Sequence, residues 1–488
     1  MADEILINMT PRETRVAVVE NGVLQEVQIE RALKRGSVGN IYKGRVTRVL
    51  PGMQAAFVEI GLERAAFLHV ADMMPPATVG EETPPMPERS VSQLLHEGKD
   101  IIVQVAKDPI GSKGARLTAW LSIPSRYLVL LPHTRSIGVS ARITDEDERK
   151  RLRELVAELD PELAHGYIVR TNAEGQSRDA LAEDIAYLGK LWRELGANMP
   201  RARVGECVYE ELSLPLRALR DLLRDGVEKV RVDSLECWRR CQAFAERFMP
   251  ELVERIERYE GARPIFDLYG VEDELQRALD KEVPLKSGGR LAIDHTEAMT
   301  TIDVNTASFV GTRNLEETVY RTNLEAAQAA ARQLRLRNVG GIVIIDFIDM
   351  FDAEHRRQVL RTLEKALQRD HVKTTVYEMS ALGLVEMTRK RTTETLARQL
   401  CEPCPACNGR GSQKTVETVA YEIFREITRA VRQFDTGKLM VMANPRVVAW
   451  IVDEDSVALG ELEEFIGKPI LFQAEDHYAQ EQFDVVLM

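Results

Sequence analysis

The sequence predicts a multidomain α/β protein, and three observations support this prediction. A chain of 488 residues is too long for one hydrophobic core, so several domains are expected. Residues 38–73 consist of short alternating stretches broken by glycine and proline, which is typical of a small β-barrel. From about residue 281 the pattern changes to strands separated by long amphipathic helices, which indicates a β-α-β sheet.

The other parts of the chain also fit a multidomain α/β protein. Residues 5–30 alternate as three strands, joined by turns at Thr10-Pro11 and at Glu20-Asn21-Gly22. Residues 126–214 mix short strands with acidic helices, and residues 415–488 predict a small mixed α/β region.

Composition narrows the functional classes. The chain is 44% hydrophobic and 29% charged, as in soluble globular proteins. It has no apolar run of about 18 residues and no signal-peptide pattern at its start, so we expect a cytoplasmic protein that does not cross a membrane. The net charge of −12 argues mildly against nucleic-acid binding. Two basic runs, 332–338 and 388–398, are either solvated helix faces or binding surfaces.

Two predicted strands carry acids that a buried strand normally excludes. Asp303 and Asn305 are two residues apart in TTIDVNT, so their side chains leave the same face of a strand. Asp346 ends GIVIID, where an ionised carboxylate among Ile and Val is costly unless it is paired. If the strands are neighbours, their carboxyl ends bring Asp303 and Asp346 together. Two carboxylates and an amide oxygen suit Mg²⁺, which favours phosphodiester hydrolysis.

A structural role is the alternative for these acids, because they could cap helices or pair with core arginines. For Asp303, Asn305 and Asp346 together the residues leave both explanations open. We expect Asp349 in the turn before the next helix, where it would cap that helix or support the site indirectly.

The stretch CEPCPACNGRG is typical of a metal knuckle. It places Cys401, Cys404 and Cys407 at successive two-residue gaps. A structural zinc ion needs four ligands, so two chains that each supply two thiolates would complete the site; a metal-free turn is the alternative. The other cysteines lie in apolar helical sequence and are expected in the core: Cys207, Cys237 and Cys241.

Aromatic residues in the barrel segment suggest a surface for single-stranded nucleic acid. Tyr42, Phe57, Phe67 and His69 fall on or beside the predicted strands, where exposed rings would stack on bases. Lys113, in the glycine-rich stretch IGSKG, is placed to reach a phosphate. Packing in the barrel core is the alternative for each aromatic residue.

Taken together, these segments resemble the RNase E/G family of bacterial endoribonucleases. The resemblance covers nearly the whole chain, through NIYKGRVTRVLPGMQAAFVEIGLERAAFLH, GSKGARLT, IVRTNAEG, RPIFDLY, AMTTIDVNT, RNLEETVYRTNLEAA, ARQLRLRNVGGIVIIDFIDM, ALGLVEMTRKR and CPACNGRG. It implies cleavage of single-stranded A/U-rich RNA to 5′-phosphate and 3′-hydroxyl ends, stimulated by a 5′-monophosphate. It also implies work in 16S rRNA 5′-end maturation and mRNA decay.

The resemblance assigns roles to residues. Asp303 and Asp346 would hold the catalytic Mg²⁺, and Asn305 would help position the attacked phosphate or the ion's water. The residues that would bind RNA are Phe57, Phe67 and Lys113.

Arg170 and Thr171 match the family's 5′-monophosphate sensor, with Arg142 as a brace of the same pocket. A guanidinium and a hydroxyl suit a terminal phosphate. Cys404 and Cys407 match a Zn²⁺ link shared between protomers, so a homodimer or homotetramer is implied, and Cys401 extends that pattern.

The family's fold would divide the chain in a definite order. The implied parts are an RNase H-like part in two segments (1–35 and 215–280), an S1 barrel of the OB-fold (36–125), a 5′-sensor region (126–214), a DNase I-like catalytic part (281–400), the zinc link (401–414) and a small C-terminal domain (415–488).

Some members of the family carry a disordered tail that recruits degradosome partners. This chain ends at Met488 in folded-looking sequence, so no such scaffold tail is expected. The competing interpretation is an RNA-binding or assembly factor that carries the S1 barrel without catalysis.

Overall fold

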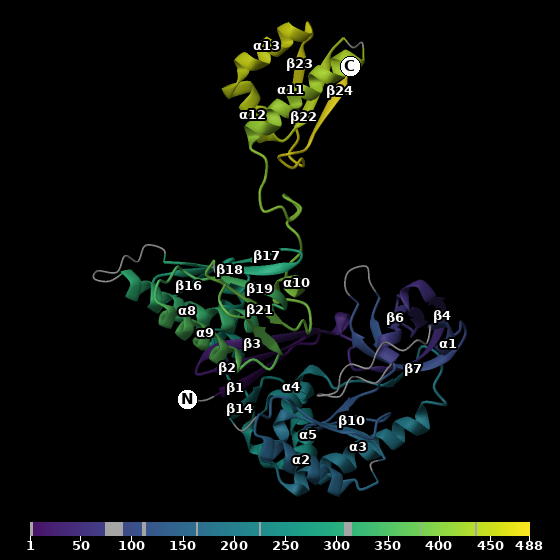
Figure 1. Cartoon of the computed structure of the whole chain (residues 1–488). Coiled ribbons are helices and arrows are strands. Elements are labelled where there is room, and N and C mark those ends of the chain that lie inside the picture. Colours follow the sequence, from purple (N-terminus) through teal and green to yellow (C-terminus); the bar gives the residue numbers. More distant parts are fainter. Residues whose placement is uncertain are drawn as a thin grey trace. The chain divides into compact units, whose positions relative to one another are not determined.

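The computed structural model describes residues 3–73, 91–109, 114–162, 164–223, 226–306, 315–380, 382–434 and 437–488. The chain divides into two compact units, Met1–Leu396 and Ala397–Met488, each of mixed α/β structure (Figure 1). The expectation of a multidomain α/β protein is therefore confirmed.

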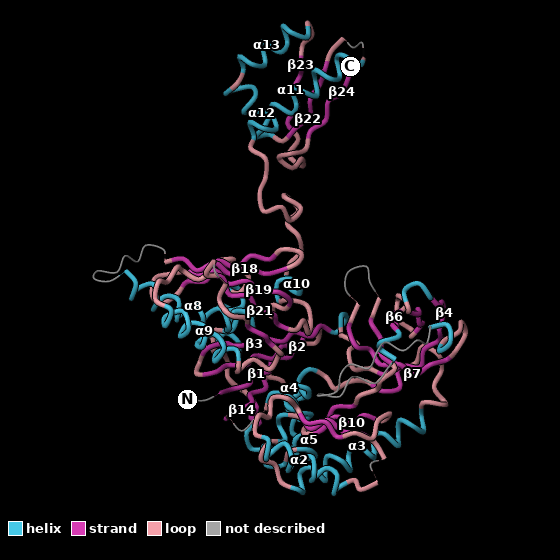
Figure 2. The backbone as a smooth tube through the Cα atoms, viewed as in Figure 1, coloured by secondary structure: helices cyan, strands magenta, loops and turns pink. Residues whose placement is uncertain are grey.

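The first sheet joins the N-terminal strands to a distant segment of the chain. Its order is β15-β14-β1-β2-β3, from Ile256–Arg258, Val227–Val232, Asp3–Met9, Glu13–Glu20 and Val23–Arg31. β1 lies beside β14 although the two strands are far apart in the chain (Figure 2). The two strands run parallel, with Ile5 opposite Val230. The β2–β3 turn forms at Asn21 and Gly22, whose positive φ angles of 53° and 75° suit this Asn-Gly pair.

Helices cover this sheet and continue the chain beyond it. Those that pack on it are α4 (Leu214–Leu222) and α5 (Leu235–Phe248), and the next two are α6 (Ile265–Leu268) and α7 (Val271–Arg277). Cys237 and Cys241 lie in the core between α5 and the sheet, as predicted.

The predicted barrel is present and closed. Its strands are β4 (Ile41–Leu50), β5 (Ala55–Glu59), β6 (Ala66–His69), β8 (Arg116–Thr118) and β7 (Asp100–Lys107), and β7 pairs with β4 to close the ring. Helix α1 (Val91–Leu94) packs against it, and β13 (Cys207–Tyr209) adds to the outside of β4. The core prediction for Cys207 is wrong, because the residue lies exposed on this short strand rather than in a helix.

A four-stranded sheet follows the barrel. Its order is β11-β12-β10-β9, from Ile137–Val139, Gly166–Val169, Leu128–Leu131 and Ile123–Pro124. The helices that pack against it are α2 (Glu146–Leu159) and α3 (Arg178–Asn198).

An extensive apolar core lies beneath a six-stranded sheet. The order is β16-β17-β18-β19-β21-β20, from Glu282–Pro284, Arg290–His295, Met299–Asn305, Gly341–Asp346, Leu384–Arg389 and Thr374–Val376. Helices α8 (Leu315–Leu336) and α9 (Ala353–Leu367) pack together on one face (Figure 1). Along each strand, apolar residues on that face alternate with exposed residues on the other.

The second unit begins within α10 (Leu396–Leu400) and contains a small sheet. The order is β23-β22-β24, from Ile470–Ala474, Leu439–Ala443 and Phe483–Leu487. Its helices are α11 (Val416–Gln433), α12 (Pro445–Ala449) and α13 (Ser456–Ile466).

Arginines from both basic runs are buried in ion pairs. Arg335 of α8 lies within 2.6 Å of Glu20 and 3.2 Å of Glu26, which ties α8 to the first sheet. Arg389 of β21 pairs with Asp370 at 2.6 Å, and both side chains are only 2% exposed. Both predictions for the basic runs, a solvated helix face and a binding surface, are therefore wrong for Arg335 and Arg389. In the described part of the chain, every helix is too short or too polar to cross a lipid bilayer.

Candidate functional site

The acids of β18 and β19 meet on the open face of the six-stranded sheet. The two strands are parallel and in register, so that Asp303 stands directly opposite Asp346. Their neighbours Ile302 and Ile345 point into the packed face, and the alternation therefore leaves both carboxylates exposed. The expected juxtaposition of Asp303 and Asp346 is present.

The carboxylates of this site repel one another. Partial burial, followed by the charges of Asp303 and Asp349, raises the pKa of the Asp346 carboxyl. Such a cluster of like charges is relieved by a bound cation, and hard oxygen ligands suit Mg²⁺. The described residues contain no group of three or more His, Cys, Asp or Glu side chains that converge as metal ligands. A site of two carboxylates that retains several water molecules is consistent with that result.

Asn305 and Asp349 flank the pair. Asn305 Nδ2 donates a hydrogen bond to Asp303 Oδ2 at 2.6 Å, which orients the Asp303 carboxylate. Asp349 lies in the turn before α9, as expected, but the capping role proposed for it is wrong. Asp352 is the cap, because its side chain accepts from the Glu354 backbone N–H at 2.7 Å.

A buried residue that the sequence analysis missed supports the same turn. Asn323 of α8 is fully buried, and its Nδ2 donates to the Ile348 carbonyl at 2.8 Å. The Ile348 N–H in turn donates to Asn323 Oδ1 at 3.1 Å. This pair of hydrogen bonds fixes the backbone between Asp346 and Asp349. The available signal was an asparagine among the apolar positions of an amphipathic helix.

A cavity of about 700 Å³ brings together the three residues assigned to the 5′-phosphate sensor. Arg142, Arg170 and Thr171 all line it. The Thr171 hydroxyl lies 3.3 Å from the Ser140 hydroxyl, and Arg142 donates to the Asp370 carbonyl at 3.1 Å.

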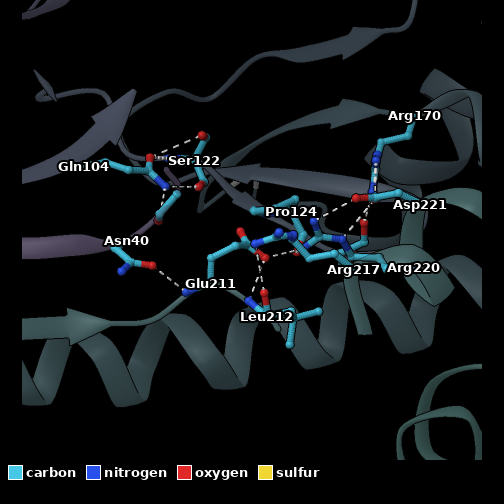
Figure 3. A network of polar contacts seen from close by, with 12 residues as sticks. Asn40, Gln104, Ser122, Pro124, Arg170, Glu211, Leu212, Arg217, Arg220 and Asp221 are labelled. Atoms are coloured by element: carbon cyan, nitrogen blue, oxygen red, sulfur yellow. Dashed lines mark hydrogen bonds and ion pairs between the residues drawn. The ribbon is translucent and has the colours of Figure 1, made fainter. Parts of the chain in front are cut away.

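A polar network holds Arg170 in that cavity (Figure 3). Its Nη2 donates to Asp221 at 2.7 Å, and its Nη1 donates to the Ser125 carbonyl at 2.6 Å. Asp221 also pairs with Arg220, which reaches Glu211 at 2.7 Å. Burial alone would raise the pKa of Asp221, but the charges and hydrogen bonds of Arg220 and Arg170 outweigh it and lower that pKa. Asp221 therefore stays ionised and fixes the guanidinium.

The barrel aromatics divide between the two faces of their strands. Phe57 and Phe67 are cross-strand partners on the outer face, with ring centroids 6.2 Å apart at a steep angle, and His69 follows at 6.4 Å from Phe67. Tyr42 is buried in the core, so only the packing alternative holds for it. Lys113 lies outside the described residues.

The cysteine knuckle supplies two neighbouring thiols. Backbone N–H groups of Gly411 and Gly409, and a hydrogen bond from Cys404, lower the pKa of Cys407 and favour its thiolate. Cys401 and Cys404 are exposed. Within the described residues the three cysteines form no three-ligand site, so two thiolates from one chain would fit half of a zinc site.

Comparison with known proteins agrees with this geometry. The sequence profile described as "Ribonuclease E/G family" matches residues 122–392, and the profile "RNase E/G, Thioredoxin-like domain" matches residues 403–487. The chain is 53% identical to Ribonuclease G of Escherichia coli (strain K12) and of Haemophilus influenzae, over 100% of both chains in each case. It is 35% identical to Ribonuclease E of E. coli (strain K12), over 94% of this chain and 43% of that protein. The resemblance seen in the motifs is confirmed: the chain belongs to the ribonuclease E/G family.

Proposed function

We propose that this protein is an endoribonuclease of the ribonuclease G type. It hydrolyses single-stranded A/U-rich RNA to 5′-phosphate and 3′-hydroxyl ends and is stimulated by a 5′-monophosphate. The observation that carries the proposal is the in-register pair of Asp303 and Asp346 on an open sheet face. Full-length identity of 53% to Ribonuclease G supports the same activity. The substrates that the family resemblance implies are 16S rRNA precursors and mRNA.

Each residue of the acidic site has a separate task. Asp303 and Asp346 hold the metal ion, and Asn305 orients Asp303 and contacts the attacked phosphate or a metal-bound water. A bound Mg²⁺ supplies polarisation of the phosphoryl oxygen and acidifies a water molecule. Asn323 acts through Ile348 as a positioning residue, because it fixes the backbone that follows Asp346.

RNA contacts are assigned to two further regions. The outward rings of Phe57 and Phe67 stack on RNA bases, and Lys113 contacts the sugar-phosphate backbone of the RNA. The cavity of Arg170, Thr171 and Arg142 receives the 5′-phosphate.

The finer architecture belongs to the same proposal. Residues 1–35 and 215–280 form one RNase H-like part, a division that the mixed first sheet supports. The barrel is an S1 domain within 36–125, the sensor region spans 126–214, and the DNase I-like catalytic part spans 281–400. The zinc link at 401–414 joins protomers into a homodimer or homotetramer through Cys404 and Cys407, and 415–488 forms the small domain.

Asp303→Asn and Asp346→Asn are each expected to reduce cleavage by more than about 100-fold. Loss of a residue that only orients a metal ligand reduces activity by up to about 100-fold, and loss of the ligand itself should cost more. Each variant loses a carboxylate ligand, whereas RNA binding persists. The assay follows a 5′-labelled single-stranded RNA with Mg²⁺ and with EDTA. Asp294→Asn is the matched control, since Asp294 lies on adjacent β17 and pairs with Lys281. Normal cleavage by Asp346→Asn would refute the two-aspartate site, and binding without EDTA-sensitive cutting by the natural protein would favour a non-catalytic RNA-binding factor.

Arg170→Ala should abolish the preference for 5′-monophosphate RNA over 5′-hydroxyl RNA. The guanidinium supplies the charge that meets the terminal phosphate. Cleavage of the 5′-hydroxyl substrate serves as the internal control and should stay the same. An unchanged ratio of the two rates would remove Arg170 from the sensor.

Asn323→Ala should raise the Mg²⁺ concentration needed for half-maximal cleavage by about 10–100-fold, as for other groups that orient metal ligands. The variant leaves the Ile348 N–H and carbonyl without their partners, so the turn between Asp346 and Asp349 loosens. A titration of activity against Mg²⁺, with RNA affinity measured alongside, checks this. A purely structural Asn323 would lower the amount of folded protein and leave the Mg²⁺ midpoint in place.

Joint replacement Cys404→Ser and Cys407→Ser should remove bound zinc and shift the protein toward monomer. Two thiolates per chain complete a four-ligand site only when protomers associate. Zinc content and size-exclusion chromatography are the readouts, and Cys207→Ser is the control because Cys207 is exposed elsewhere, on β13. If the double variant and the natural protein eluted at the same volume, a shared zinc ion would be excluded as the main link between protomers.

A further inference from the structure

A second arginine in the 5′-phosphate cavity has unused donors. Arg126 lines the cavity and is only 8% exposed. Its Nε and Nη1 atoms are buried and have no hydrogen-bond partner among the residues that the structure describes. The Glu251 carboxylate lies 3.8 Å from Nη1, which is beyond hydrogen-bond distance, and its side chain is 56% exposed.

Buried polar groups are normally paired, and a buried guanidinium without partners is costly. The other described arginines nearby show the usual arrangement. Arg217 donates to the Leu212 carbonyl and to Glu30, and Arg170 donates to Ser125 and Asp221. Arg126 therefore has donor capacity that the fold does not use, in a cavity open to a ligand.

The backbone fixes Arg126 next to Arg170. The Arg170 N–H donates to the Tyr127 carbonyl at 2.8 Å, and Arg170 Nη1 donates to the Ser125 carbonyl. Both carbonyls that flank Arg126 in the chain are thus held by Arg170. The Arg126 guanidinium also lies over the Tyr127 ring, 5.2 Å from its centroid. Arg126 and Arg170 therefore line the same cavity, so an anion bound by Arg170 would lie in a cavity that Arg126 also lines.

We propose that Arg126 is a phosphate-binding residue of this cavity and contacts a phosphate at the 5′ end of the RNA. The inference rests on the proposed endoribonuclease function and deepens its 5′-end recognition. The volume of about 700 Å³ is in the range of pockets that hold whole small ligands, so a terminal nucleotide fits as well as its phosphate. A phosphate oxygen supplies the acceptors that the buried guanidinium lacks.

The test uses Arg126→Met in the full chain, because methionine keeps an unbranched side chain and removes the charge. The probes are non-cleavable 2′-O-methyl RNA oligonucleotides with a 5′-monophosphate or a 5′-hydroxyl. We expect about 10-fold or greater loss of affinity, the value of a charged hydrogen bond. Loss confined to the 5′-monophosphate probe places Arg126 on the terminal phosphate. Equal loss with both probes places it on the first internal phosphate.

Ligand-free stability separates binding from a structural role. Removing unpaired buried donors should leave the melting temperature of the free protein unchanged or higher. The matched control is Arg217→Met in the same cavity: it breaks two existing hydrogen bonds, so it should lower the melting temperature and reduce affinity much less. Arg126→Lys, a milder variant that keeps the charge, should show intermediate affinity.

Unchanged affinity of Arg126→Met and Arg126→Lys for both probes would overturn the inference, as would a lower melting temperature with normal binding. If Arg170→Ala loses the 5′-monophosphate preference while Arg126→Met binds both probes with unchanged affinity, only the Arg126 assignment fails. If Arg170→Ala keeps the preference and Arg126→Met binds both probes with unchanged affinity, the sensor itself fails.

Discussion

The parallel, in-register pairing of β18 with β19 is the constraint on which the site depends. Parallel neighbours require a crossover, and α8 supplies it. Register is fixed by the buried face, where Ile302, Val343 and Ile345 pack on α8 and α9. A slip of one residue would turn Asp346 into that core. The apolar side chains therefore determine where the carboxylates lie.

Buried polar groups then hold the loops around this sheet. Asn323 fixes the turn after Asp346, and the pair of Asp370 and Arg389 anchors the segment after α9 to β21. Arg335 ties α8 to Glu20 and Glu26 of the first sheet. Breaking such a pair leaves a buried charge without its partner, which is strongly destabilising. The arrangement places rigid support behind an exposed acidic site.

Sequence patterns predicted features that depend on local chemistry or strict alternation. The Asn21-Gly22 turn, the closed barrel, α8 and the facing pair of Asp303 and Asp346 are examples. Features that depend on distant partners were missed or wrong. Of the two roles expected for Asp349, capping is wrong, because Asp352 has the required geometry. Cys207 lies on a short added strand instead of in a core helix. The roles of the Arg126 and Asn323 donors could not be predicted, because they depend on which groups from distant parts of the chain surround them in the fold.

The central claim is that Asp303 and Asp346 bind one divalent cation. The most direct measurement is anomalous diffraction from crystals grown with Mn²⁺, which accepts the same oxygen ligands as Mg²⁺. We expect one strong peak at roughly 2.0–2.2 Å from an oxygen of both carboxylates, close to the Mg²⁺ distance. A peak that contacts Asp346 and Asp349 without Asp303, or no peak at the pair, would contradict it.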